Sequence, residues 1–122
     1  MPVRIRSKER VQGSVTPTAL NVETTIFSLA AQADDFILEG LISFRGLQTG
    51  DQAVLRMYAK VDGVTEELLD EVTVAGPLRP SVVRIPALTL PYNSTPRVTV
   101  TQIAGTPRTV YYAFIYQVME VI

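Results

Sequence analysis

Three pairs of adjacent carboxylates are the side chains of this chain whose types could perform acid–base or metal chemistry. They are Asp34-Asp35, Glu66-Glu67 and Asp70-Glu71. Two carboxylates can act as the acid and base of a glycosidase, or supply oxygen ligands to calcium. None of the pairs has the spacing of an EF-hand loop, which needs alternating ligands, a central glycine and a terminal glutamate. We therefore interpret them as solvated turns or strand surfaces, and expect no bound metal and no other cofactor.

Histidine and cysteine are both absent from the 122 residues. Their absence excludes thiol nucleophiles, Ser-His-Asp triads, Cys/His zinc sites and disulfides. Residues 46–51 contain two glycines but lack the Gly-Lys-Ser/Thr of a phosphate loop, and we interpret them as a hairpin connection. The sequence thus predicts that the protein is not an enzyme.

Tyrosine side chains offer a different chemistry, that of a binding surface. Sugar-binding β-sandwiches use exposed aromatic platforms, and protein interfaces are also rich in tyrosine. Tyr92 and Asn93 lie in a predicted loop, and they define the alternative function of a carbohydrate- or receptor-binding module. The absence of tryptophan makes a carbohydrate site the weaker form of this alternative.

The composition fits one folded domain, with 47% hydrophobic and 19% charged residues. The apolar runs are too short to span a bilayer, and the residues after Met1 lack the pattern of a secretory signal. The net charge of −1 hides an asymmetry. Residues 1–18 hold four basic residues against Glu9, a net charge of +3, whereas residues 19–122 hold 7 basic and 11 acidic residues, a net charge of −4. We expect a basic N-terminal arm, residues 1–18, followed by a β-sandwich domain, residues 19–122.

The basic arm has three interpretations. It is either a solvated terminus, an arm that docks on a neighbouring subunit or an acidic surface, or a weak grip on nucleic acid. Its backbone is expected to be an extended tail or an edge strand. No aromatic residue interleaves its charges, which argues against stacking on single-stranded nucleic acid. We expect no specific nucleic-acid binding.

Alternation of apolar and polar residues predicts about seven strands with turn signals every eight to twelve residues. The predicted strands are residues 19–31, 36–45, 53–61, 64–74, 82–90, 97–104 and 109–119. Residues 64–74 also have helical propensity, but the preceding Asp62-Gly63 is a hairpin signal and favours a return strand. The pattern predicts an all-β fold, a single antiparallel β-sandwich with either jelly-roll or immunoglobulin-like topology.

Residues 97–121 have the clearest strand pattern, and we interpret them as a hairpin with a three-residue loop at 105–107. This register pairs Val98 with Phe114 and Val100 with Tyr112, which gathers the large apolar groups on a core face. The opposite face is also apolar and needs cover from another subunit or from the arm. Together with the arm it gives a candidate interface: Arg4, Arg6, Lys8, Arg10, Ile103, Tyr111, Ile115 and Met119.

Two segments resemble short all-β structural proteins of tailed bacteriophages and archaeal viruses. They are residues 36–63, with the pattern strand-GLQTGD-strand-DG, and residues 97–110, RVTVTQIAGTPRTV. The resemblance implies a virion component such as a capsid decoration or spike protein, often a symmetric homotrimer, made in the host cytoplasm and without catalytic residues. The partners it implies are copies of the same chain and a capsid or other virion protein, with no membrane.

Overall fold

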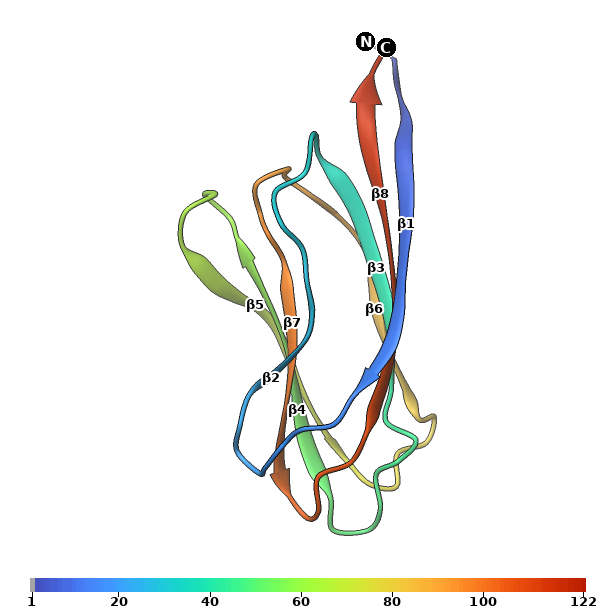
Figure 1. Ribbon diagram of the computed structural model, residues 1–122, viewed down its shortest axis with the longest axis vertical. Coiled ribbons are helices and arrows are strands. Elements are labelled where there is room, and N and C mark those ends of the chain that lie inside the picture. The colour runs from blue at the N-terminus through green and yellow to red at the C-terminus, as the bar shows by residue number, and fades with distance from the viewer. Residues whose placement is uncertain (1) are drawn as a thin grey trace.

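The computed structural model describes residues 2–122, which form eight strands in two antiparallel sheets (Figure 1). The strands are β1 Val3–Val15, β2 Thr24–Ser28, β3 Phe36–Ser43, β4 Gln52–Lys60, β5 Glu66–Ala75, β6 Val82–Leu90, β7 Arg97–Ala104 and β8 Val110–Val121. The predicted all-β sandwich is confirmed. It has one strand more than the seven expected, because the N-terminal segment forms β1. Residues 2–122 contain no helix with the length and apolar character needed to cross a membrane.

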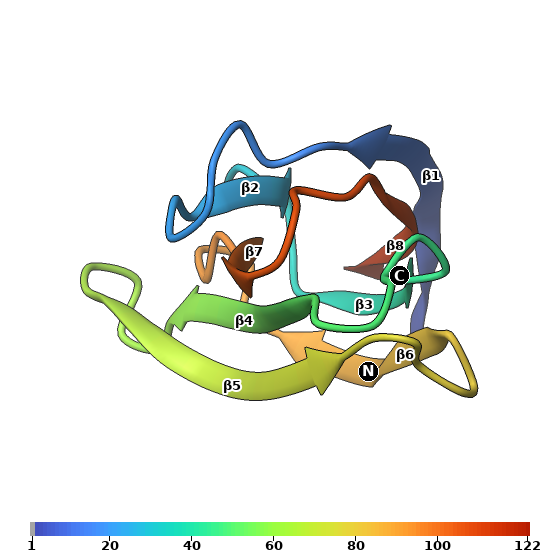
Figure 2. The ribbon, with the colours of Figure 1, turned by 90° about the horizontal axis from the view of Figure 1, so that it is seen from below.

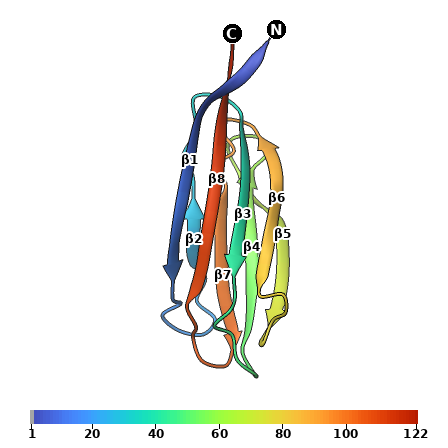
Figure 3. The same ribbon diagram turned by 90° about the vertical axis from the view of Figure 1, so that its right-hand side faces the viewer.

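The order of the strands identifies the topology that the sequence left open. One sheet, here called sheet A, has the order β1-β8-β3-β6, and the other, sheet B, has the order β2-β7-β4-β5. The first strand therefore pairs with the last, the second with the seventh, the third with the sixth and the fourth with the fifth. This nested pairing, folded into two layers of four strands, is the jelly roll (Figures 2 and 3).

The predicted hairpin of residues 97–121 is wrong, although both of its strands exist. β7 lies in sheet B between β2 and β4, whereas β8 lies in sheet A between β1 and β3. Val100 is paired with Leu55 of the same sheet, and Phe114 with Gly40 and Val11. The loop between β7 and β8 crosses from one sheet to the other, so their core faces meet across the sandwich instead of side by side.

Residues 46–51 make the same kind of crossing, because β3 lies in sheet A and β4 in sheet B. Their interpretation as a hairpin turn is therefore also wrong. The Asp62-Gly63 signal was a correct prediction, since β4 and β5 pair along their length. Residues 64–74 are confirmed as strand and not helix.

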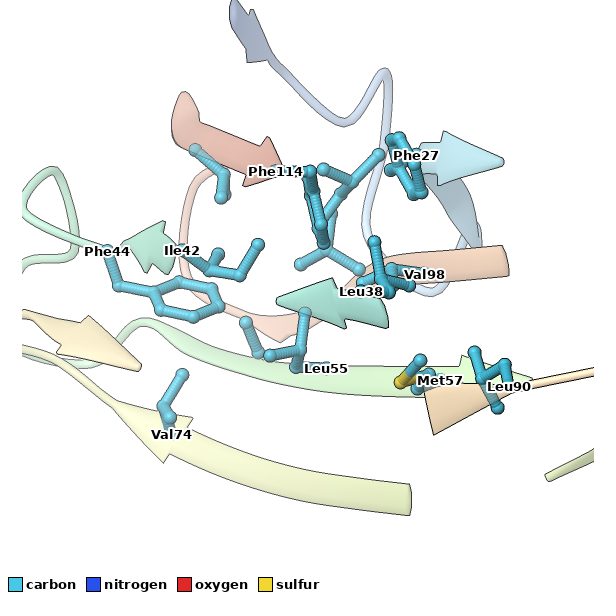
Figure 4. Packing of buried hydrophobic residues seen from close by; sticks show 14 of the residues in the cluster. Phe27, Leu38, Ile42, Phe44, Leu55, Met57, Val74, Leu90, Val98 and Phe114 are labelled. Carbon is cyan, nitrogen blue, oxygen red and sulfur yellow. The ribbon is translucent and has the colours of Figure 1, made fainter. Parts of the chain in front are cut away.

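The core lies between the two sheets and contains large apolar side chains from both (Figure 4). Phe36, Leu38 and Phe114 of sheet A and Val98 and Val100 of sheet B are completely buried. The Phe27 and Phe114 rings stack across the layers, with their centroids 4.3 Å apart. Each such side chain contributes about 1.5–3 kcal/mol through burial.

Two crossing loops are tied together at one end of the sandwich by the buried carboxylate of Asp51. Its oxygens accept hydrogen bonds from the backbone N–H of Gln48 at 2.8 Å, from the backbone N–H of Thr106 at 3.0 Å and from Nε of Arg108 at 2.7 Å. Gly105 has a positive φ of 83°, and a Cβ there would lie 1.9 Å from the carboxylate. The carboxylate thus fixes two of the connections at which the chain changes sheets, β3 to β4 and β7 to β8.

Candidate functional site

The outer face of sheet A carries an apolar surface at its centre, which we call the apolar face. Cross-strand partners on β3 and β8 build it, since Leu41 lies opposite Ala113 and Glu39 opposite Ile115. Leu41 is 49% exposed and Val82 on β6 is 40% exposed. The apolar face comprises Leu41, Val82, Pro86, Ala87, Tyr111, Ala113 and Ile115.

Two shallow depressions shape the apolar face. One has a volume of about 330 Å³ and is lined mainly by Leu41, Pro86, Ala87 and Ile115, together with the charged Glu39 and Arg84. The other has a volume of about 230 Å³ and lies beside Tyr111. Leu41 and Ala113 line both, so the depressions are continuous along the sheet. Such a hollowed apolar surface can accept apolar side chains of a partner.

The sequence placed Tyr111, Ile115 and Met119 on one surface, and all three do lie on β8 with half-buried side chains. The Arg45 guanidinium covers the ring of Tyr111, with its carbon 3.7 Å from the ring centroid, so this residue is partly covered within the subunit. Met119 lies away from the depressions, near the end of β8, opposite Ile5 of β1.

Ile103 is separated from the other three apolar residues. It lies on β7, in sheet B, and is 38% exposed. Its grouping with Tyr111 depended on a hairpin that does not form. The four basic residues all lie on β1: Arg4, Arg6, Lys8 and Arg10.

The N-terminal segment lies beside β8 as an edge strand of sheet A and does not fold across the apolar face. Cover by the arm, one of the two expectations for this surface, is therefore wrong. Nε of Arg4 donates to Glu120 at 2.5 Å, and Arg6 lies within 4.0 Å of the same carboxylate. Lys8 and Arg10 form no ion pair with any residue in 2–122.

The outer face of sheet B is polar, and its side chains form hydrogen bonds and ion pairs with one another. Glu23 accepts hydrogen bonds from Oη of Tyr58 at 2.5 Å and from Oγ1 of Thr99 at 2.7 Å. Nη2 of Arg97 donates to Glu66 at 2.8 Å, and its guanidinium lies over the Tyr58 ring. This network needs no partner to satisfy it.

The same contacts favour the ionised form of the carboxyl groups and the neutral form of the tyrosine. The hydroxyl groups of Tyr58 and Thr99 lower the pKa of Glu23, and the bond to Glu23 raises the pKa of Tyr58. The bond from Arg97 lowers the pKa of Glu66. At neutral pH the outer face of sheet B is therefore a set of paired charges.

The acidic residues of β5 form a second charged edge that sequence reasoning treated only as a solvated surface. Glu66 and Glu71 are engaged by Arg97 and Arg56 respectively. Glu67 and Asp70 are exposed and form no ion pair within residues 2–122. The excess of acidic residues in 19–122 is the sequence signal that could have identified this edge.

The acidic side chains that could have bound a metal ion do not gather into a site. Within residues 2–122, no group of three or more acidic, histidine or cysteine side chains is placed to hold a metal ion. A hollow of about 680 Å³ lies beside the loop of residues 77–81, and no carboxylate lines it. Asn93 is packed against the turn at Gly63, where a Cβ would collide with its amide, so only Tyr92 of the alternative site projects into solvent.

Comparison with known proteins finds structures with a similar fold but identifies no family. No family model matches the sequence, and no curated protein matches it. A chain from the Bacillus endospore appendages, described as disulfide-linked pili, superimposes with a TM-score of 0.57 at 18% identity, over 92% of this chain and 87% of that one. The VP2 subviral particle of infectious bursal disease virus gives a TM-score of 0.51 at 13% identity, over 95% of this chain but only 33% of that one. These likenesses show the fold alone.

Proposed function

We propose that the protein is a non-catalytic structural subunit that works by assembling with further copies of itself. The observation that carries this proposal is the contrast between the two outer faces of the sandwich. Sheet B presents polar groups that are already paired, whereas sheet A presents a hollowed apolar face around Leu41 and Ile115. Burying that face against another subunit removes apolar surface from water, at about 25 cal/mol for each Å².

The folds of the two compared structures support this role, because one comes from a pilus and the other from a viral particle. The disulfide links of those pili have no counterpart in these 122 residues, since they contain no cysteine. The narrower assignment is a virion component, as a capsid decoration or spike subunit in a homotrimer, and it rests on the sequence resemblance to phage and archaeal virus proteins.

Sedimentation velocity over a concentration series tests the assembly role. We expect purified protein at micromolar concentration to sediment as species larger than the 13.4 kDa chain, because an interface of standard size, about 1,600 Å² in total, supports stable association. A single monomeric species throughout the series, persisting when a candidate virion partner is added, would remove the basis of the proposal.

A further inference from the structure

We infer that copies of this chain also join edge to edge, with β1 of one copy beside β5 of the next; this inference rests on the assembly role proposed above. β1 is an outer strand of sheet A and β5 an outer strand of sheet B. Seen end-on, they lie at opposite corners of the sandwich (Figure 2). An outer strand carries a row of N–H and C=O groups that can pair with a strand of another chain.

The four outer strands differ in how well they could accept a partner. β2 has only five residues, and β6 contains Pro86, which cannot donate a backbone hydrogen bond. β1 has 13 residues and β5 has 10, and neither contains proline. Both also expose large apolar side chains, including Ile5 on β1 and Leu68 and Leu69 on β5. The two long edges are therefore the ones open to pairing.

Charge determines which of these edges can meet. β1 presents the unpaired cations Lys8 and Arg10, whereas β5 presents the unpaired carboxylates Glu67 and Asp70. Two β1 strands side by side would place like charges together, and so would two β5 strands, which is destabilising. Only the combination of β1 with β5 brings opposite charges into contact. The charges thus favour a contact between two different edges.

The register within each sheet places both pairs of charges on matching sides. Lys8 and Arg10 lie opposite Gln117 and Ile115 of β8, on the outer side of sheet A. On β5, a bulge lets Glu67 and Asp70 share one side although they are three residues apart, because their β4 partners are the buried Ala59 and Met57. Both acids therefore lie on the inner side of sheet B.

The outer side of sheet A and the inner side of sheet B face the same direction, because the two sheets are stacked. A second copy that is related to the first by translation alone therefore places the acidic side of its β5 next to the basic side of β1 of the first copy. This contact joins different surfaces on the two copies. Each pair therefore keeps one free β1 edge and one free β5 edge, to which further copies can add. The assembly closes into a ring if the copies rotate, as in a trimer, and otherwise forms an open filament.

Charge reversal at the two edges tests this arrangement. One variant carries Lys8→Glu with Arg10→Glu, a second carries Glu67→Lys with Asp70→Lys, and a third carries all four changes. All four side chains are exposed, and circular dichroism with thermal melting checks that each variant folds. Thr18→Glu with Gln48→Glu and Arg79→Glu is the control, since it changes the net charge as much as the first variant but acts on exposed residues outside β1, β5 and the apolar face.

We expect each two-site variant alone to sediment as smaller particles than the wild type, because its two edges then repel. An equimolar mixture of the two variants should recover wild-type size, as should the four-site variant alone, because opposite charges again face each other. The control should keep wild-type size.

Four outcomes overturn the inference. If the reversed variants assemble like the wild type, the β1 and β5 edges are not the contact, although the assembly role stands. The same conclusion follows if the particle size of the control falls as much as that of the reversed variants. If mixing and the four-site variant fail to restore size, the charges do not pair with each other. A wild type that is monomeric at every concentration overturns this inference and the assembly role together.

Discussion

Asp51 shows how one side chain fixes the path of this chain. It is 2% exposed, and its three hydrogen bonds hold two of the loops at which the chain crosses between the sheets. The N–H groups of Gln48 and Thr106 and the guanidinium of Arg108 outweigh the effect of burial and lower the pKa of this carboxyl group. The carboxylate is therefore bound most tightly when it is ionised.

Replacing this carboxylate by an amide, in Asp51→Asn, should lower Tm by about 5–10 °C at pH 7, because an ionised acceptor of three hydrogen bonds is lost. Its folded pKa lies below its unfolded value, so the stability it contributes is present above the unfolded value and is lost as the pH falls through the folded one. Calorimetry from pH 7 to pH 2 should show the Tm difference between wild type and variant constant near neutrality and shrinking below about pH 4.

Glu39→Gln is the matched control, since Glu39 is exposed and forms no ion pair within residues 2–122. Its Tm should stay close to that of the wild type across the same pH range. A Tm difference for Asp51→Asn that grew as the pH fell would contradict the assigned role of the carboxylate.

The elements were largely predictable from the sequence, but their pairing was not. Alternation located β3, β4, β6, β7 and β8, because each has one side in the core. The same alternation fits a hairpin of β7 and β8 and a crossing between sheets equally well, since Val98 and Phe114 point into the core in both. The contacts of the buried Asp51 with Thr106 and Arg108 hold the crossing, and they join residues 55 and 57 positions apart in the chain.

For the candidate site too, the positions within one strand were predictable and the neighbouring strands were not. The side of β8 that carries Tyr111 and Ile115 follows from alternation within one strand, and it was correctly predicted to be the outer side. Ile103 was grouped with them only through an assumed strand pair, and the structure places it in the other sheet. Leu41 and Val82 were missed, because their place beside β8 depends on the order of strands in sheet A.

The division between an N-terminal arm and a sandwich leads to a prediction about β1. Its first part, up to Arg10, is exposed, whereas Val11 and Val15 pack against the core. Deleting residues 1–10 should therefore leave Tm nearly unchanged and weaken association, because the basic edge is removed. Deleting residues 1–18 should lower Tm further but leave a folded β domain.

Calorimetry and sedimentation of the two truncations provide the measurement. An unfolded chain after removal of residues 1–18 would mean that β1 is an essential strand of the sandwich and not a separable arm. Wild-type association by the shorter truncation would argue against any part of the arm in assembly.

At the scale of the whole molecule, polarity is distributed unequally over the sandwich. The outer face of sheet B is covered by ionic pairs such as Arg97 with Glu66, and the edges β1 and β5 carry opposite charges. The outer face of sheet A has a continuous hollowed apolar surface. A subunit with one apolar face and two complementary edges has distinct surfaces for distinct neighbours, as an extended assembly requires.

The most direct test of this account compares the same substitution on the two outer faces. Ile115→Lys places a charge in the apolar face, and Ile103→Lys places it on the outer side of sheet B. Sedimentation equilibrium measures the association constant of each variant. We predict that Ile115→Lys weakens association by about 10- to 100-fold, since a buried isoleucine contributes about 1.5–3 kcal/mol, whereas Ile103→Lys changes it less than about threefold. Equal effects of the two substitutions, or a larger effect at Ile103, would contradict assembly through the apolar face.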